Sequence, residues 1–424
     1  MGDTISNKLN RRQFMGHATV ATFALMGIDA GAASKQRASI KQVGHEPHLG
    51  QYAEVRGLHA GAFQPSDWQA GTLNWLFEQR APLIEPAAGR YRNIYAPTLI
   101  PERGGYRIYY GGWDGVPTPN DRVYTQWTPD FRRFEGRRLI IDHGAFIHVN
   151  NCSALRIPSG AYRMMCTAYP DQNNCNKPAA FTSPNGEIWD HKLPYQAQLS
   201  DLIEMEGYPN YAHTDINGTN VILYEDGRYR LFFNDTRLRK YVYQASSTDF
   251  KRFRLDGPTL ATDHGVNDVK KFMVNGRPWY LMALHMNTDR IWYSLSQDEI
   301  HFSPEQVLTL HQGAADRYIV AVGLVADSKA VYGVLYGAGA IPALDENRIF
   351  AKWLQKRVVF EASGGNIEPD SAFGPDAARI AIPDGSGLQG RFAIYAEDGQ
   401  TALLRSKTVR LQAGEIWRLD GLLI

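Results

Sequence analysis

The stretch "DRVYTQWTPDFRRF" (residues 121–134) decides the fold, because similar fourteen-residue phrases return four more times along the chain. It holds an aromatic-rich strand pattern, a turn at Thr128-Pro129-Asp130 and a closing Phe134. The other copies are "NKPAAFTSPNGEIW" (176–189), "KYVYQASSTDFKRF" (240–253), "DRIWYSLSQDEIHF" (289–302) and, more faintly, "NRIFAKWLQKRVVF" (347–360), and they align without a gap. A repeat period of ~50 residues indicates units that bury their apolar faces only against one another.

Two more strand-like runs joined by a turn precede each phrase. The turns contain Gly-Gly, Ser-Gly, Asp-Gly, Asn-Gly and Asp-Ser, which tolerate the positive φ angles of tight hairpins. Each unit therefore reads as four antiparallel strands, the content of one propeller blade. We predict an all-β chain with a five-bladed β-propeller over residues 91–360. Residues 34–90 are expected to form an N-terminal extension packed on it, and residues 361–424 a short β-rich C-terminal appendage.

The closing aromatic residue of each phrase is predicted to fill the wedge between neighbouring blades. These residues are Phe134, Trp189, Phe253, Phe302 and Phe360. The segments "TSPNGEIW" and "SSTDFKRF" also approach the serine-x-aspartate box, which is a folding turn. The repeat thus describes architecture, and function has to be sought where the copies differ.

The N-terminal segment has the pattern of an export signal. Arg11-Arg12 precedes an apolar run from Ala18 to Ile28 and a small-residue cleavage pattern at 30–32. The apolar run is shorter than the ~20 residues that span a bilayer, which disfavours the alternative of a membrane anchor. We predict a twin-arginine signal peptide over residues 1–33 and a mature chain that is periplasmic or secreted, with no membrane contact after cleavage.

Composition narrows the choice of ligand. The chain has 45 basic and 44 acidic residues, so no global field attracts a nucleic acid. The three cysteines, Cys152, Cys166 and Cys175, fall within a short segment and predict a Cys152–Cys175 disulfide in an oxidising compartment. A zinc site with His148 is the alternative, but the C-x-x-C spacing is missing. No metal site and no required cofactor are predicted; a calcium ion on the propeller axis stays an open alternative.

The blade geometry predicts a shared funnel. The innermost strand of a blade begins on the face where its antiparallel neighbour ends, so these positions in all units surround one axis. They are rich in acids, amides and aromatic residues, which suit a ligand with many hydroxyls, above all a carbohydrate. The alternative is that such Asp and Asn residues only close turns, and that His285 is a core histidine. The predicted substrate-binding residues are Asn93, Trp113, Asp114, Asn151, Asp235, Lys270, His285 and Arg317, from a wider set that also includes Tyr95, His148, Asn150, Asn217, Tyr169, Asp171, Asn234, Asn267, Asn287, Asp316 and Tyr336.

Two segments predict catalytic residues. In "YAHTDING" (211–218), His213 and Asp215 alternate onto one strand face, and in "HGVNDVKK" (264–271) Asp268 shares a face with Lys270. Two acids in different surroundings can divide the acid and base roles. We therefore predict Asp215, Asp268 and His213 as the catalytic group.

The blade count, the opening "YAPTLI…GYRIYYGG" and the segment "YEDGRYRLFFND" resemble the five-bladed propeller glycoside hydrolases over residues 91–360. These are the arabinanase, xylosidase and arabinofuranosidase group of family 43, the β-fructosidases and the anhydrogalactosidases of family 117. The resemblance implies cleavage of a glycosidic bond by an acid and a base, commonly with inversion, and a histidine acid in the last group. The chain departs from family 43 at Ala96, which precedes Pro97 where a base Asp is expected, and at Asn151, an amide near a second acid.

We therefore predict an exported glycosidase that hydrolyses a poly- or oligosaccharide. A non-catalytic carbohydrate-binding propeller is the alternative that the missing Asp supports. A sialidase-like enzyme is disfavoured, because it needs several converging arginines and only Arg317 stands at an inner-strand start.

Overall fold

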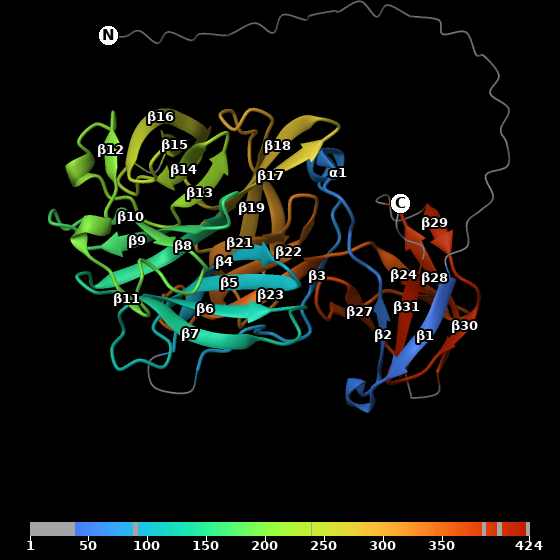
Figure 1. Cartoon of the computed structure of the whole chain (residues 1–424). Helices are drawn as coiled ribbons and strands as arrows, with labels where there is room; N and C mark the ends of the chain where they lie inside the picture. Colours follow the sequence, from blue (N-terminus) through green and yellow to red (C-terminus); the bar gives the residue numbers. More distant parts are fainter. Residues whose placement is uncertain (1–38, 88–91, 239, 384–386, 397–400, 421–424) are drawn as a thin grey trace, which may run out of the picture. The chain divides into compact units, whose positions relative to one another are not determined.

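The computed structural model describes residues 39–87, 92–238, 240–383, 387–396 and 401–420 (Figure 1). The predicted signal peptide, residues 1–33, lies outside them. The helices are short: α1 (Pro65–Ala70), η1 (Pro47–Leu49), η2 (Leu199–Asp201) and η3 (Tyr211–His213). In these ranges no helix has the length and apolarity needed to cross a bilayer. Strands dominate, so the predicted all-β class is confirmed.

Within the described residues the strands form seven sheets, five of which follow the repeat. The first contains β4 (Ile94–Glu102), β5 (Gly105–Gly112), β6 (Arg122–Thr128), β7 (Glu135–Asp142) and β11 (Tyr195–Gln196). The second contains β8 (His148–Arg156), β9 (Tyr162–Tyr169) and β10 (Lys177–Ser183). The third contains β13 (Val221–Glu225), β14 (Arg228–Asn234), β15 (Tyr241–Ser247), β16 (Arg252–Ala261) and β12 (Glu204–Glu206).

The fourth sheet contains β17 (Gly265–Val274), β18 (Arg277–His285), β19 (Arg290–Ser296) and β20 (Gln306–Leu310). The fifth contains β21 (Tyr318–Ala326), β22 (Val331–Gly339), β23 (Arg348–Leu354) and β3 (Trp75–Phe77). The first strands of these sheets contact one another in a cycle, β4 with β8, β8 with β13, β13 with β17, β17 with β21, and β21 with β4. This cycle brings the beginnings of distant chain segments together.

The recurring phrase forms the third strand of a sheet and the turn after it. In the third sheet, Ser247 Oγ accepts the backbone N–H of Phe250, and Asp249 Oδ1 accepts those of Lys251 and Arg252. Phe250 takes a left-handed φ of 64°, which these bonds hold in place. Thr128 and Asp130, and Ser183 and Asn185, accept backbone N–H groups in the same way. Asp298 does so as well, whereas Ser296 Oγ accepts the N–H two residues on. The predicted folding turn is therefore present in four copies.

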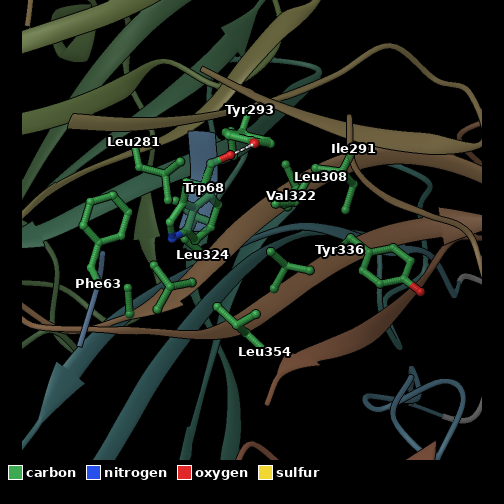
Figure 2. Close-up of a cluster of buried hydrophobic side chains, with 14 of the residues drawn as sticks. Phe63, Trp68, Leu281, Ile291, Tyr293, Leu308, Val322, Leu324, Tyr336 and Leu354 are labelled. Atoms are coloured by element: carbon green, nitrogen blue, oxygen red, sulfur yellow. Dashed lines mark hydrogen bonds between the residues drawn. The ribbon is translucent and has the colours of Figure 1, made fainter. Parts of the chain in front are cut away.

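The fifth sheet is completed by the N-terminal segment. β3 pairs antiparallel with β23, so a strand that precedes the repeats becomes the outer strand of the last one. Just before it, α1 places Trp68 in a core of side chains from the fourth and fifth sheets, where the Tyr293 hydroxyl donates to the Trp68 carbonyl (Figure 2). Trp68 is 1% exposed and contacts Phe63, Trp75 and Tyr293 edge-on or tilted.

The two remaining sheets combine both ends of the described chain. One contains β1 (Ser39–His45), β31 (Glu415–Asp420), β2 (Tyr52–Arg56), β27 (Ala377–Ala381) and β26 (Ser371–Ala372). The other contains β25 (Gly365–Ile367), β24 (Val358–Ala362), β28 (Leu388–Tyr395), β29 (Ala402–Arg405) and β30 (Val409–Leu411). They share one apolar core, and Figure 1 shows β1 and β2 among the C-terminal strands.

This arrangement changes two expectations. The segment 34–90 is not one extension: β1 and β2 pair with C-terminal strands, whereas β3 joins the repeats. Phe360 does not fill a wedge between repeats, because it belongs to β24 and packs on Phe392 in the core of the terminal sheets. The faint fifth phrase ends there because Leu354, Lys356 and Arg357 replace the turn-forming residues of the other copies.

The predicted disulfide is wrong. Cys152, Cys166 and Cys175 are all free and buried. Cys152 lies in a packed core with its Sγ directed at the Ala96 carbonyl, whereas Cys175 lies in a loop where the Arg237 guanidinium contacts its Sγ at 3.1 Å. Burial raises the pKa of the Cys152 thiol to about 12.

Candidate functional site

A cavity of 640 Å³ lies where the first strands begin. The starts of first strands contribute Tyr95, His148 and Gly265, and the ends of second strands contribute Trp113, Tyr169, Asn234 and His285. The starts of third strands add Asp121 and Asn176. The other lining residues are Asn150, Asn151, Thr167, Asn217, Gly218, Asp235, Thr236, Asp263, Met286, Asn287, Val320, Leu344 and Asp345.

Irregular backbone near the strand starts presents these side chains. The pairing shifts by a β-bulge between Tyr95 and Thr98 in β4, and between Asn150 and Ser153 in β8. Ala96 and Asn151, inside the two bulges, both have a φ of 50°. β17 and β21 carry shifts in the same part of the strand. A bulge turns a side chain out of the alternating pattern, and bulges are frequent beside functional sites.

Asp121 is the centre of a buried polar network. Its Oδ2 accepts a hydrogen bond from the Tyr95 hydroxyl at 2.8 Å and another from Asn150 Nδ2. Burial, reinforced by the charge of Asp121, raises the pKa of Tyr95 well above its ordinary value, so the phenol stays a proton donor. The Asp121 side chain is 6% exposed, and its Oδ1 has no hydrogen-bond partner within the described ranges. An acceptor left in this state costs free energy unless a ligand or water bonds to it.

His148 lies beside Asp121, and both residues line the cavity. Its Nδ1 lies 3.2 Å from Asp121 Oδ2 and 3.2 Å from the Asp121 backbone nitrogen. The neutral ring can accept the backbone N–H at Nδ1, whereas a ring protonated there donates to the carboxylate. The backbone N–H of Val149 donates to the Asp121 carbonyl at 3.0 Å and fixes the two residues relative to each other. The pair can therefore hold and release a proton at the cavity.

The remaining acids of the cavity differ in how firmly they are held. Asp235 is 5% exposed; its Oδ2 accepts from the Tyr208 hydroxyl and its Oδ1 from the Arg237 backbone N–H, each at 3.0 Å. Asp263 and Asp345 are exposed. Among the described residues, no Lys or Arg lines the cavity. Burial lowers the pKa of His285 to about 4, so this histidine is neutral near pH 7 and the lining is acidic.

The predicted catalytic residues do not line the cavity. Asp215 Oδ1 accepts from the Asn176 backbone and side chain, and its Oδ2 accepts from Thr236. Burial raises the pKa of Asp215, but these hydrogen bonds outweigh it and the pKa lies below its ordinary value. Asp215 thus supports two lining residues from behind.

Asp268 and His213 are also placed elsewhere. Asp268 is buried between two sheets, where it pairs with Lys270 at 2.9 Å and accepts the Leu324 N–H at 2.9 Å. His213 is exposed in η3, and its carbonyl accepts from Arg237. The geometry does not support these residues as a catalytic group, because the bulge in β17 directs Asp268 toward β21.

Half of the predicted binding residues line the cavity: Trp113, Asn151, Asp235 and His285. Four do not. Asn93 is fully buried and accepts the Asn347 N–H. Asp114 pairs with Arg137 at 3.0 Å, and Lys270 pairs with Asp268. Arg317 is exposed beside the Tyr318 ring. Seven further residues of the wider set line the cavity, namely Tyr95, His148, Asn150, Asn217, Tyr169, Asn234 and Asn287, whereas Asp171, Asn267, Asp316 and Tyr336 do not.

Sequence reasoning missed Asp121 and Asn176. A third strand begins at the same end of the sheet as the first, because the hairpin between second and third strands reverses there. Both residues occupy the first position of the recurring phrase. That position belongs to the structural repeat, although its charge differs among the copies. Within the described ranges, no cluster of three or more His, Cys, Asp or Glu side chains could hold a metal ion.

Comparison with known proteins gives a fold likeness alone. No protein-family profile and no curated protein sequence matches the chain. Among solved structures, a presumed glycosidase from Bacteroides thetaiotaomicron matches with a TM-score of 0.50 and 14% identity, covering 69% of this chain and 99% of that one. Two further solved structures match with TM-scores below 0.5. The catalytic domain of a family 62 α-L-arabinofuranosidase from Coprinopsis cinerea has a TM-score of 0.47 at 12% identity, covering 67% and 98% of the two chains.

The second of these structures is a family 32 β-fructofuranosidase from Bombyx mori, with a TM-score of 0.45 at 10% identity. The match covers 83% of this chain and 92% of that one. The chain therefore shares the fold of a presumed glycosidase, and the resemblance predicted from its repeats is confirmed at the level of fold.

Proposed function

We propose that this protein is a glycoside hydrolase whose five repeat sheets form a five-bladed propeller around the site. The observation that carries the proposal is the cavity at the common end of the first strands, where the Asp121–His148 pair meets amide, aspartate and aromatic side chains. Amide and carboxylate groups bind sugar hydroxyls, and the half-buried Trp113 and Tyr169 supply aromatic rings that can cover C–H surfaces. The Asp121–His148 pair adds a group that can transfer a proton, which hydrolysis requires and binding alone does not.

In the proposed mechanism, His148 and Asp235 divide the two roles. Protonated His148, held by Asp121, gives its proton to the glycosidic oxygen as the bond from that oxygen to the anomeric carbon breaks. Asp235 accepts a proton from a water molecule, whose oxygen forms the new bond to the anomeric carbon. We choose Asp235 over Asp263 and Asp345 because it is buried and fixed by Tyr208 and the Arg237 backbone. A fixed base costs less to orient than an exposed one.

The test is product formation by the purified mature chain. Neutral and acidic oligosaccharides are incubated with the wild type and with His148→Ala and Asp235→Asn, and released sugars are separated by chromatography. We expect product from the wild type and a loss of about 10²–10⁴-fold in either variant. Asp142→Asn is the matched control, because Asp142 pairs with Arg122 on β6 and does not line the cavity. Equal turnover by His148→Ala and the wild type would overturn the assignment.

A second candidate is carbohydrate binding without cleavage. It is favoured by Ala96 and Asn151, which stand where the resembled family 43 enzymes have acids. In this case the same oligosaccharides bind the wild type and are recovered intact. Ligand binding followed by calorimetry, with no product after long incubation, would establish this candidate in place of hydrolysis.

We also propose that the protein acts outside the cytoplasm, on the strength of the twin arginine at 11–12. The mature N-terminus should begin close after residue 33, and changing both arginines to lysine should leave the precursor in the cytoplasm. N-terminal sequencing of the exported protein and cell fractionation test this proposal. A precursor that is exported unchanged with two lysines would contradict it.

A further inference from the structure

A second cavity of 540 Å³ adjoins the first. Trp113, His148 and Asp345 line both cavities, so the two spaces meet at these side chains. The second cavity adds Arg92, Pro119, Glu346 and Arg348. A ligand that fills both must pass His148, the residue to which the proposed mechanism gives the proton donor.

The two cavities differ in charge. Asp121, Asp235 and Asp263 line only the first cavity, which has no Lys or Arg in its described lining. Arg92 and Arg348 line only the second. An anionic group is therefore repelled in the first cavity by like charges and finds guanidinium groups only in the second. Guanidinium matches the planar oxygen pairs of carboxylates and the oxygens of sulfate esters.

Arg348 is held in a fixed position by backbone groups. Its Nη1 donates to the carbonyl of Asn347 at 2.9 Å and to that of Arg92 at 3.3 Å. Its side chain is 20% exposed, whereas the carboxylate closest to it, Glu85 Oε2, lies 3.9 Å from its Nε on a side chain that is 68% exposed. That contact is weak because solvent screens an exposed, distant pair.

Two acids also line the second cavity and have to be weighed. Asp345 and Glu346 are exposed on the loop between β22 and β23, so water screens their charges. The buried acid of this region, Asp114, is already paired with Arg137 at 3.0 Å and accepts the Ala87 N–H. The charges of Arg348 and Arg92 also reach Asp114, but more weakly than that of Arg137, so within the described residues neither arginine is paired directly with a buried carboxylate.

We propose that the second cavity binds an acidic sugar unit, bearing a carboxylate or a sulfate ester, of an oligosaccharide whose neutral unit occupies the first cavity. The inference rests on the proposed function in that it assumes a sugar in the first cavity. It places the bond between the two units beside His148 and Trp113. The substrate class is then an acidic oligosaccharide of at least two units.

The test measures binding in the His148→Ala background, in which turnover is expected to be about 10²–10⁴-fold lower and the acids of the first cavity are kept. Calorimetry compares oligosaccharides of equal length that are neutral, uronate-containing or sulfated. We expect at least one acidic series to bind about tenfold or more tightly than the neutral one, with the difference shrinking as salt rises. Preference for the uronate or for the sulfate series identifies which acidic group is recognised.

Arginine variants locate the effect. Arg92→Gln and Arg348→Gln should each bring the ratio of acidic to neutral affinity close to one, and Arg348→Lys should restore only part of it, because an ammonium lacks the guanidinium fork. Arg133→Gln is the control: Arg133 is 73% exposed in the turn after β6, at the opposite end of that strand from Asp121. If the Arg348 variants fail to fold, Arg92→Gln still tests the inference, because Arg92 is exposed.

Equal or better binding of the neutral series would overturn the inference, as would an acidic preference that survives both glutamine variants. Failure of the proposed hydrolysis has a different signature. In that case no product forms from any substrate in the wild type, while the binding preference and its dependence on the arginines persist.

Discussion

The relation between Asp121 and His148 gives the sharpest prediction. If Asp121 acts through His148, then changing it to Asn removes a charge-assisted hydrogen bond from the transition state but leaves the shape of the site. Such a bond contributes about 1.5–3 kcal/mol, which corresponds to a loss of about 10- to 150-fold in kcat/KM. His148→Ala removes the proton donor itself and should cost about 10²–10⁴-fold.

The double variant decides between the roles. Since Asp121 has nothing to orient once His148 is gone, the double variant should be no slower than His148→Ala alone. The assay is kcat/KM on one oligosaccharide for the wild type, both single variants and the double variant, with Asp142→Asn as the control. Losses that multiply would refute the reasoning, because they would show that Asp121 contacts the substrate or the water independently. Thermal melting of each variant checks that the fold is retained.

Three further predictions test the surrounding structure. Trp68→Ala should lower the free energy of unfolding by about 3–5 kcal/mol, measured by denaturant titration, because it empties a fully buried site. The hydrogen bond from Arg405, with that from Arg391, lowers the pKa of Glu361 to about 2, so its stabilisation is present above pH 4.5 and lost as pH falls toward 2. Between about pH 2 and 6, the free energy of unfolding of the wild type should therefore change by about 1–3 kcal/mol more than that of Glu361→Gln, as measured by melting curves. Asp268→Asn should cost about 1–3 kcal/mol of stability with turnover kept; lost turnover in a stable variant would restore Asp268 as catalytic.

Much of the architecture could be predicted from local sequence. The Asp226-Gly227 and Asn275-Gly276 pairs both have positive φ at each residue and close two-residue hairpins, as their composition predicts. The recurring turn is likewise a short-range feature, because its donors and acceptors lie within five residues. Such local rules explain why the repeats could be recognised without any homologous sequence.

The pairing of the chain ends could not be predicted in the same way. β3 pairs with β23 across more than half of the chain, and β2 pairs with β27 and β31. Nothing in the short run "WLF" (75–77) distinguishes an outer strand from a helix end or a loop. Its partner is chosen by the edge that β23 leaves open, which is a property of the assembled sheet and not of either segment.

The site residues show a similar limit. Placing residues at strand starts and ends found Trp113, His148 and Asp235, because those positions follow from the antiparallel order alone. It failed for Asp268, since one extra residue in the β17 bulge turns that carboxylate toward Leu324. A bulge has no reliable sequence signal, and one residue of register reverses the face to which a side chain points.

The network around Asp121 also depends on glycines in neighbouring strands. A Cβ at Gly111 in β5 would lie 2.9 Å from the Cβ of Asn150, and one at Gly337 in β22 would lie 2.6 Å from the Cβ of Tyr95. Both contacts are closer than side chains tolerate, so these glycines let the two donors to Asp121 approach the adjoining sheets. The position of the Asp121–His148 pair therefore depends on the close packing of three sheets. Any change that moves these sheets apart should weaken the contact between Asp121 and His148 before the strands themselves unfold.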